Sequence, residues 1–133
     1  MSQALKEAEK AFRKNEVPIG AVAIKDGNVI ARAHNIRETT QDPLGHAEIL
    51  LLRKVSRKIK SWRLNGITIY VTLDPCLMCM GALLQARVDR LVFGATAPNS
   101  GVGDHQIEVT ADILGADSKK LLKQFFQILR DPK

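Results

Sequence analysis

Residues 67–79 have the sequence ITIYVTLDPCLMC, and this stretch sets the fold that the rest of the chain completes. Residues 67–73 are rich in β-branched side chains, which is typical of a buried strand. Asp74-Pro75 ends this strand, and residues 77–86 return to a helical composition. Because strands that alternate with helices build layered domains, we expect an α/β fold in which Cys76 and Cys79 lie at the start of a helix.

The sequence before this unit predicts a hairpin and two helices. Residues 19–24 and 28–33 are short apolar runs joined by Asp26-Gly27, a dipeptide that favours a tight turn between antiparallel strands. Apolar residues at helical spacing predict helices over 4–14 and 49–59, and His46 stands at the end of the loop that leads to the second helix.

The sequence after this unit predicts two short strands and a closing helix. The strands span residues 90–94 and 107–109, and an amphipathic helix follows over 118–130 with Ser118 as its N-cap. The polar stretches 37–45 and 98–103 are predicted to be loops. Strands interleaved with helices in this order predict a layered α/β domain whose sheet opens as a hairpin and continues through crossovers.

Composition limits the class of protein to which the chain can belong. With 133 residues, of which 45% are hydrophobic, residues 1–133 are expected to form a single domain. The sequence has no basic start followed by an apolar run and no stretch near the roughly 20 apolar residues of a membrane span, so we expect a soluble, cytoplasmic protein. The formal charge of +6 is compatible with a polyanionic partner such as nucleic acid but does not require one.

Two cysteines, too few for a disulfide scaffold, indicate a metal site. Because Cys76 and Cys79 are three residues apart in the first turn of a helix, their sulfurs share one face and can bind one ion. The helix dipole is expected to lower the pKa values of these thiols. His46, about 30 residues earlier, supplies a third ligand, and three protein ligands leave one tetrahedral position of a zinc ion for water.

Two alternatives remain open for this cluster. His34 or His105 would close the site and make it purely structural if either were a fourth ligand. A Cys-x-x-Cys pair after a strand is also the local context of thioredoxin-like redox proteins, although that interpretation leaves His46 and Glu48 without a role.

His46-Ala47-Glu48 followed by Pro75-Cys76-Leu77-Met78-Cys79 is the known signature of zinc-dependent nucleobase deaminases. Glu48 lies two residues beyond His46, and both side chains reach one site only where a helix begins, which Gly45 permits. There, Glu48 is expected to take a proton from the attacking water, pass it to a ring nitrogen and later protonate the departing amine. The alternative role of Glu48 is an exposed carboxylate favoured by the helix dipole.

A series of motifs extends along nearly the whole chain: Glu16-Val17-Pro18-Ile19-Gly20-Ala21-Val22, Ala33-His34-Asn35, Asp42-Pro43, His46-Ala47-Glu48-Ile49, Tyr70-Val71-Thr72-Leu73-Asp74-Pro75-Cys76, Val92-Phe93-Gly94-Ala95 and Gln124-Phe125-Phe126. In order and spacing they resemble the bacterial tRNA adenosine deaminase family, which converts the wobble adenosine of an anticodon to inosine. The resemblance implies a cytidine-deaminase-like fold of three α/β/α layers, with a mixed five-stranded sheet flanked by helices. It also implies Zn²⁺ as cofactor, tRNA as partner and a homodimer.

The resemblance also implies residues that contact the substrate. Asn35 matches the family residue that hydrogen-bonds the target base, in a pocket whose floor is near Ala47. The alternative for Asn35 is a hydrogen bond to the local backbone at the end of the hairpin. Phe125 and Phe126 are expected either to hold a neighbouring nucleotide or, at helical spacing with Leu122 and Leu129, to pack in the core.

The chain departs from the family pattern around the substrate entrance. Thr96-Ala97 replaces an Arg-Asp pair whose Asp contacts the RNA backbone, Leu44-Gly45 replaces Thr-Ala, and Asp74 replaces Glu. Only Val102-Gly103 stands where the family has a long segment after Gly101. The alternatives are therefore a deaminase of a free base, nucleoside or other nucleic acid, of guanine or cytosine type, or a catalytically altered zinc-binding subunit in a hetero-oligomeric deaminase.

Overall fold

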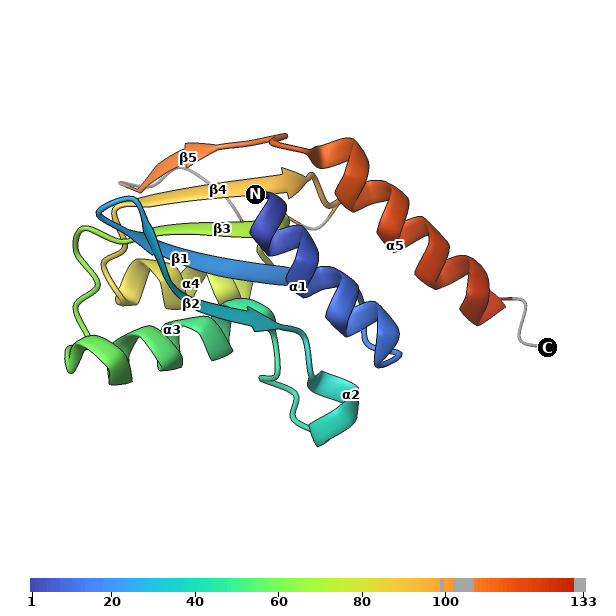
Figure 1. The fold of residues 1–133 in the computed structure, drawn as a ribbon, viewed down its shortest axis with the longest axis horizontal. Coiled ribbons are helices and arrows are strands. Elements are labelled where there is room, and N and C mark those ends of the chain that lie inside the picture. The colour runs from blue at the N-terminus through green and yellow to red at the C-terminus, as the bar shows by residue number, and fades with distance from the viewer. Residues whose placement is uncertain (99, 102–106, 131–133) are drawn as a thin grey trace.

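The computed structural model describes residues 1–98, 100–101 and 107–130, in which helices and strands alternate (Figure 1). The elements are α1 (Ser2–Arg13), β1 (Gly20–Lys25), β2 (Asn28–His34), α2 (Arg37–Thr40), α3 (Ala47–Ile59), β3 (Thr68–Leu73), α4 (Leu77–Gln85), β4 (Arg90–Ala95), β5 (Glu108–Thr110) and α5 (Gly115–Arg130). Within these ranges, every helix falls short of the length and apolar character that a membrane crossing requires.

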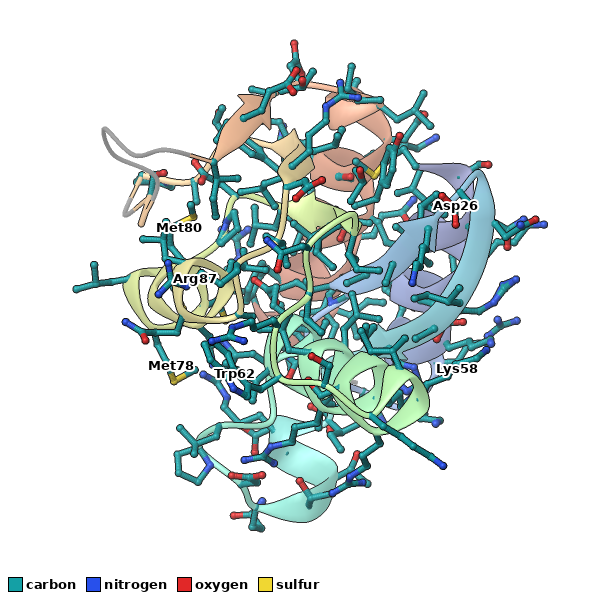
Figure 2. All side chains as sticks on the ribbon, turned by 90° about the vertical axis from the view of Figure 1, so that its left-hand side faces the viewer. Asp26, Lys58, Trp62, Met78, Met80 and Arg87 are labelled. Atoms are coloured by element: carbon teal, nitrogen blue, oxygen red, sulfur yellow. The ribbon has the colours of Figure 1, made fainter. Side chains whose placement is uncertain are left out.

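The strands form one mixed sheet in the order β2-β1-β3-β4-β5. β1 pairs antiparallel with both β2 and β3, whereas β3, β4 and β5 run parallel. The hairpin turns at Asp26 and Gly27, which have positive φ angles of 50° and 78°, and Asp26 is labelled beside this turn in Figure 2. The predicted hairpin and the five-stranded mixed sheet are confirmed.

Two layers of helices cover the sheet, which gives the domain three layers (Figure 1). α3 packs against α4 and contacts β1 and β2. On the opposite face, α1 packs against α5, and these two helices contact β1 to β4. This arrangement confirms the cytidine-deaminase-like α/β/α architecture.

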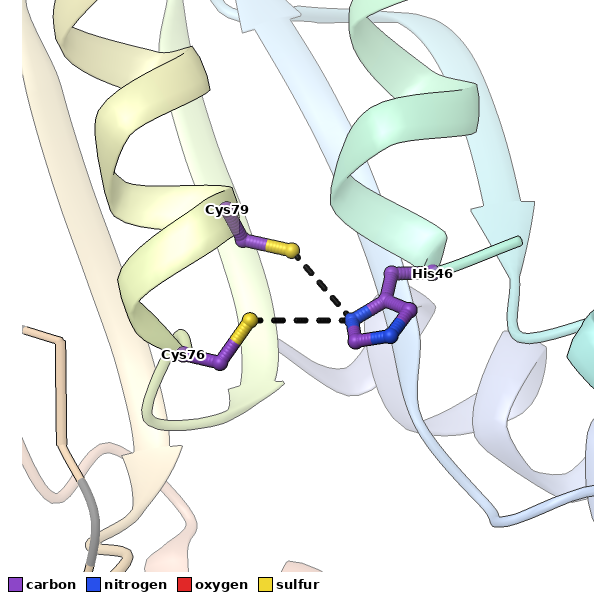
Figure 3. Close-up of side chains that lie close together, drawn as sticks. All are labelled: His46, Cys76 and Cys79. Carbon is purple, nitrogen blue, oxygen red and sulfur yellow. Dashed lines mark hydrogen bonds between the residues drawn. The ribbon is translucent and has the colours of Figure 1, made fainter. Parts of the chain in front are cut away.

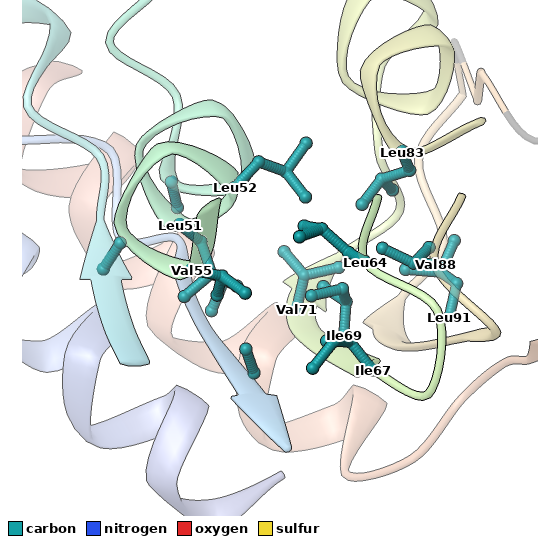
Figure 4. Packing of buried hydrophobic residues seen from close by; sticks show 14 of the residues in the cluster. Leu51, Leu52, Val55, Leu64, Ile67, Ile69, Val71, Leu83, Val88 and Leu91 are labelled. Carbon is teal, nitrogen blue, oxygen red and sulfur yellow. The ribbon is translucent and has the colours of Figure 1, made fainter. Parts of the chain in front are cut away.

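The main core lies between the sheet and the layer of α3 and α4 (Figure 4). Leu51 and Val55 are four residues apart on α3, so they share one face of the helix, and Ile69 and Val71 alternate along β3. All four side chains are fully buried. Because full burial of one such side chain contributes about 1.5–3 kcal/mol, this layer fixes the position of α3 against the sheet.

α1 approaches the sheet most closely at Gly20. A Cβ atom on residue 20 would lie 2.2 Å from the carbonyl oxygen of Ala4 and 2.4 Å from the backbone nitrogen of Ala8. Both alanines lie on the buried face of α1. Residue 20 is therefore glycine because the helix backbone occupies the space of a side chain.

Two lysines of α3 bind the backbone of the outer strand β2. The ammonium of Lys54 donates to the carbonyl oxygen of Arg32 at 2.7 Å, and that of Lys58 donates to the carbonyl oxygen of Ile30 at 3.0 Å. Lys58 is labelled in Figure 2. Part of the basic run on α3 therefore fastens the helix to the hairpin.

Two predictions about local structure are wrong. The expected loop 37–45 contains the short helix α2, whose backbone is held by a buried carboxylate from another part of the chain, so its own sequence does not indicate it. The closing helix begins at Gly115 rather than at Ser118. Ser118 is buried inside α5 against Gly94, and its hydroxyl has no hydrogen-bond partner among the described residues. The apolar periodicity that marks this helix starts only at Leu121, which displaced the predicted boundary.

We expect Gly20→Ala to lower the free energy of unfolding by about 1–3 kcal/mol, because the added methyl group pushes α1 away from β1. Gly81→Ala is the matched control, since a Cβ there meets no atom within 4 Å. In the helix α4, that change should raise the free energy of unfolding by up to about 1 kcal/mol. Urea denaturation measures both changes, and equal effects of the two substitutions would contradict the close contact at Gly20.

Candidate metal centre and active site

His46, Cys76 and Cys79 come together between the starts of α3 and α4 (Figure 3). The Nδ1 atom of His46 lies 3.7 Å from the sulfur of Cys76 and 3.5 Å from the sulfur of Cys79. All three candidate ligand atoms lie within 4.8 Å of one another. An imidazole and two thiols at these separations can bind a single ion such as zinc, at metal–ligand distances of about 2.0–2.3 Å.

Both helices present their ligands from the residue just before the first turn. His46 is the N-cap of α3, and Cys76 is the N-cap of α4, and both have extended backbones. Gly45 makes the position of His46 possible, because a Cβ at residue 45 would lie 2.9 Å from the Cα of Arg37. Cys79 follows in the first turn of α4, so the expected placement of the two cysteines is confirmed.

His34 does not join this cluster. Its Nδ1 lies 3.3 Å from a carboxylate oxygen of Glu7, and its Nε2 lies 3.1 Å from the ammonium of Lys14. His105 lies outside the described residues. In the part of the chain that the structure describes, the cluster of candidate ligands therefore consists of these three residues, His46, Cys76 and Cys79.

In the thioredoxin-like alternative, the two cysteines would act as a redox pair and His46 would have no part in the site. Both cysteines are free thiols, and each sulfur faces the ring of His46. The geometry thus gives His46 the role that the redox interpretation lacks.

Burial and neighbouring charges decide the protonation of the ligands. Burial, followed by the charge of Arg37, lowers the pKa of His46, which favours the neutral imidazole that binds metals. Burial raises the pKa of the Cys79 thiol, and the neighbouring Glu48 and Cys76 raise it further. The expectation that the helix dipole lowers the thiol pKa is therefore wrong for Cys79 in the absence of a cation. A bound cation would supply the positive charge that the thiolate needs.

Glu48 is the second residue of α3, and its carboxyl group is buried beside the ligands. Burial raises the pKa of Glu48, against the opposing effects of its own backbone N–H and of the Cys79 thiol. A buried carboxyl group with a raised pKa, beside the candidate ligands, is suited to accept and return a proton. The structure therefore excludes the alternative of an exposed Glu48 carboxylate.

A cavity of about 240 Å³ opens beside the cluster. Pockets for drug-sized ligands have volumes of roughly 300–1,000 Å³. This cavity is smaller, and its size suits a single base. The residues that line it are Val17, Ile19, Asn35, Arg37, His46, Ala47, Glu48 and Phe126. The structure thus places the expected substrate residues Asn35 and Ala47 in the same cavity as His46 and Glu48.

Asn35 bonds to the local backbone and also lines the cavity. Its side-chain oxygen accepts a hydrogen bond from the backbone N–H of Arg37 at 3.1 Å, so it does order the local backbone. The same bond directs the amide NH₂ group of Asn35 away from that N–H. Asn35 is buried and lines the cavity. Asn35 is therefore held in place through its oxygen, and its nitrogen is available as a donor.

The two neighbouring phenylalanines of α5 have different surroundings. Phe125 is buried and packs edge-on against Phe12, with ring centroids 6.2 Å apart. Phe126 is 43% exposed and lines the cavity. Phe125 therefore packs in the core, whereas Phe126 forms part of the cavity wall.

Asp74 ties the segment that follows β4 to the metal-binding turn. Its carboxylate accepts hydrogen bonds from the backbone N–H of Ala97 at 3.3 Å and from the hydroxyl of Ser100 at 2.7 Å. The backbone N–H of Gly101 donates to the carbonyl oxygen of Pro75 at 2.8 Å. Two of the departures from the family pattern, at residues 74 and 97, thus bond to each other. The shortened segment after Gly101 lies outside the described residues.

Glu16 holds α2 in place on the other side of the cavity. Its buried carboxylate accepts hydrogen bonds from the backbone N–H of Glu38 at 3.0 Å and from both the N–H and the hydroxyl of Thr39. Burial by itself would raise the pKa of Glu16, but these hydrogen bonds, together with the charge of Arg37, lower it. The backbone N–H of Ile36, just before α2, donates to the carbonyl oxygen of Gly45 at 3.0 Å, so this carboxylate also helps to position His46.

Three cavity residues were not recognised as functional in the sequence. Val17 and Ile19 belong to a motif that the sequence analysis used only for the family resemblance, and Arg37 lies in the stretch predicted to be a loop. The signal that could have found Val17 and Ile19 is their position within that motif. No sequence pattern marks Arg37, because its place depends on the contacts of Glu16.

The fold and the site define a deaminase. The sequence profile of the MafB19-like deaminase family matches residues 1–130, so this class covers nearly the whole chain. Within it, the chain belongs to the tRNA-specific adenosine deaminase family: it is 44% identical to the tRNA-specific adenosine deaminase of Bacillus subtilis (strain 168) over all of this chain and 90% of that protein. The alignment spans 145 positions against 133 residues in this chain, so the chain lacks residues that this relative carries.

Solved structures support the same assignment. A structure from studies of A-to-I editing by tRNA:A34 deaminases at the wobble position is 38% identical, with a TM-score of 0.86 over 91% of this chain and 96% of the other. A guanine deaminase from Bacillus subtilis is 32% identical, with a TM-score of 0.68 over 71% of this chain and 61% of that protein. The structural similarity is thus more complete for the tRNA deaminase.

We expect Glu16→Gln to lower the free energy of unfolding at neutral pH by about 1–3 kcal/mol, because hydrogen bonds to a charged acceptor are lost. The pKa of Glu16 is lowered by folding, so its contribution is present above the usual carboxylate pKa of about 4.3 and is lost as the pH falls through the lower folded value. The difference between wild type and variant should therefore shrink below about pH 4. Urea denaturation across this range, with the exposed Glu9→Gln as control, measures it, and a difference independent of pH would contradict the role of the charge.

Proposed function

We propose that this deaminase is zinc-dependent and that it converts adenosine to inosine at the wobble position of tRNA. The observation that carries the proposal is the cluster of His46, Cys76 and Cys79, with ligand atoms within 4.8 Å of one another, beside a cavity that also holds Glu48. The tRNA substrate is supported by the names and the coverage of the relatives described above. A tRNA substrate also agrees with the formal charge of +6 and with action in the cytoplasm.

The donor set fits zinc. One neutral imidazole and two thiols match the nitrogen and sulfur ligands that zinc prefers, and three ligands are typical of a catalytic rather than a structural site. When bound there, zinc would activate a water molecule for attack on the ring carbon that bears the amine.

The chain's own residues would then position the base and move its protons. Glu48 accepts one proton from the attacking water and delivers it to a ring nitrogen. It then takes the second proton from the same oxygen, now bonded to the ring carbon, and transfers it to the amine, which departs as ammonia while the carbonyl forms. The side-chain nitrogen of Asn35 donates a hydrogen bond to the base. Ala47, which is fully buried, provides a floor without a side chain that would fill the cavity.

A second candidate function is deamination of a free base of guanine type. It is supported by the 32% identity with a guanine deaminase and by the shortened segment after Gly101, which would otherwise help to surround an anticodon loop. Ammonia release from tRNA, adenosine, guanine and cytosine compounds distinguishes the candidates. Release from guanine alone would contradict the tRNA proposal, and release from none of them would favour a zinc-binding subunit that needs a different partner chain.

We expect Glu48→Gln to retain zinc but to lower turnover by about 100-fold or more, because the proton carrier is lost while the ligands remain. His46→Ala and Cys76→Ala should each lose the bound metal. Elemental analysis and ammonia release measure both properties on the same preparations. Ordinary activity of the Glu48 variant would contradict its role, and wild-type protein that is active without zinc would contradict the cofactor.

We also expect a homodimer that uses the surface next to the metal centre. Leu77, which directly follows Cys76, is 79% exposed, and Leu44, two residues before His46, is 43% exposed. Sedimentation velocity should give twice the chain mass of 14.7 kDa, and Leu77→Lys should shift the species toward the monomer. Leu129→Lys, at an exposed position near the end of α5, is the control. A monomeric wild type that gains activity only with a second, different chain would support the heteromeric alternative instead.

A further inference from the structure

Arg37 lies at the cavity without a role in the chemistry described so far. It is the first residue of α2, its side chain is exposed, and it lines the same cavity as His46, Glu48 and Asn35. Its charge is close enough to lower the pKa values of His46 and Glu16. A permanent positive charge therefore stands at the mouth of the site.

The backbone of Arg37 is fixed, whereas its guanidinium is free. The backbone N–H donates to the side chain of Asn35, and the next two residues of α2 bind the buried carboxylate of Glu16. Within residues 1–98, 100–101 and 107–130, no carboxylate comes within ion-pair distance of the Arg37 guanidinium. The charge of Arg37 lowers the pKa of Glu16, but the Glu16 carboxylate already accepts hydrogen bonds from Glu38 and Thr39.

A free guanidinium at the edge of a base-sized cavity is suited to an anion that enters together with the base. When the base of a nucleotide occupies the cavity, the sugar and the flanking phosphates stay at its mouth. A phosphodiester presents two charged oxygens, which a planar guanidinium can bind through parallel hydrogen bonds. A free base carries no such anion.

We infer that Arg37 binds a backbone phosphate next to the target nucleotide and so selects nucleic acid over the free base. This inference rests on the proposed function, because it requires a substrate that carries phosphates. Asn35 and Arg37 then act as one unit: the N–H of Arg37 orients the amide that meets the base, and the guanidinium of the same residue holds the backbone.

The test compares Arg37→Gln with wild type on an RNA anticodon stem–loop that has adenosine at the wobble position. We expect KM and the equilibrium Kd for this RNA to rise roughly tenfold, as for loss of a hydrogen-bonded charge, with zinc content unchanged. Arg37→Lys should recover part of the loss. Arg87→Gln is the matched control. It removes the same charge at a position just after the C-terminal end of α4, whereas the cysteines lie at the start of that helix.

Neutral methylphosphonate linkages, placed one at a time on each side of the target adenosine, identify the contact. One of them should weaken binding by wild type about as much as Arg37→Gln does, and it should have little further effect on the variant. If both linkages act fully on the variant, or if Arg37→Gln binds as wild type does, the assignment of Arg37 is overturned.

The outcomes also separate this inference from the proposed function. A wild type that binds the RNA through Arg37 without releasing ammonia contradicts the proposed tRNA deamination and supports the phosphate contact. A wild type that deaminates the RNA with no dependence on Arg37 contradicts the contact alone. A wild type that neither binds nor deaminates the RNA overturns both.

Discussion

The site depends on one constraint: α3 and α4 begin side by side at the same edge of the sheet. Each helix offers a ligand from its N-cap, His46 in one case and Cys76 in the other, and Cys79 follows within a turn. The core that α3 and α4 share with β3 keeps the two helix starts together, and the imidazole and the sulfurs meet only because of this. The cluster of His46, Cys76 and Cys79 is therefore a product of helix packing rather than of any single loop.

Three buried carboxyl groups, those of Glu16, Glu48 and Asp74, differ in the hydrogen bonds that they accept. Glu16 and Asp74 each accept hydrogen bonds from backbone N–H groups and hydroxyls: Glu16 holds α2, and Asp74 holds residues that follow β4. Glu48 is equally buried but has few donors, so burial raises its pKa whereas that of Glu16 is lowered. The same chemical group thus has a lowered pKa where donors surround it and a raised pKa where burial dominates.

Local patterns were enough to predict the main elements and the cluster of His46, Cys76 and Cys79. The hairpin around Asp26-Gly27, the strand before Cys76 and the helix after it follow from turn chemistry and from the spacing of apolar residues, which act over a few positions. The start of α5, the helix α2 and the place of Arg37 were not predictable in this way, because each depends on contacts between residues far apart in sequence. The pKa of Cys79 was predicted in the wrong direction for a related reason: the helix dipole is a local effect, whereas burial beside Glu48 is set by the tertiary packing.

The bonds from Lys54 and Lys58 to the carbonyl oxygens of β2 have a consequence for self-association. β2 is an outer strand of the sheet, and unpaired carbonyls on such a strand can accept a strand from another molecule. Two of these acceptors are already taken by ammonium groups, and the cations themselves repel an approaching backbone of a like chain. Extension of the sheet through β2 by a strand of another copy is thereby disfavoured.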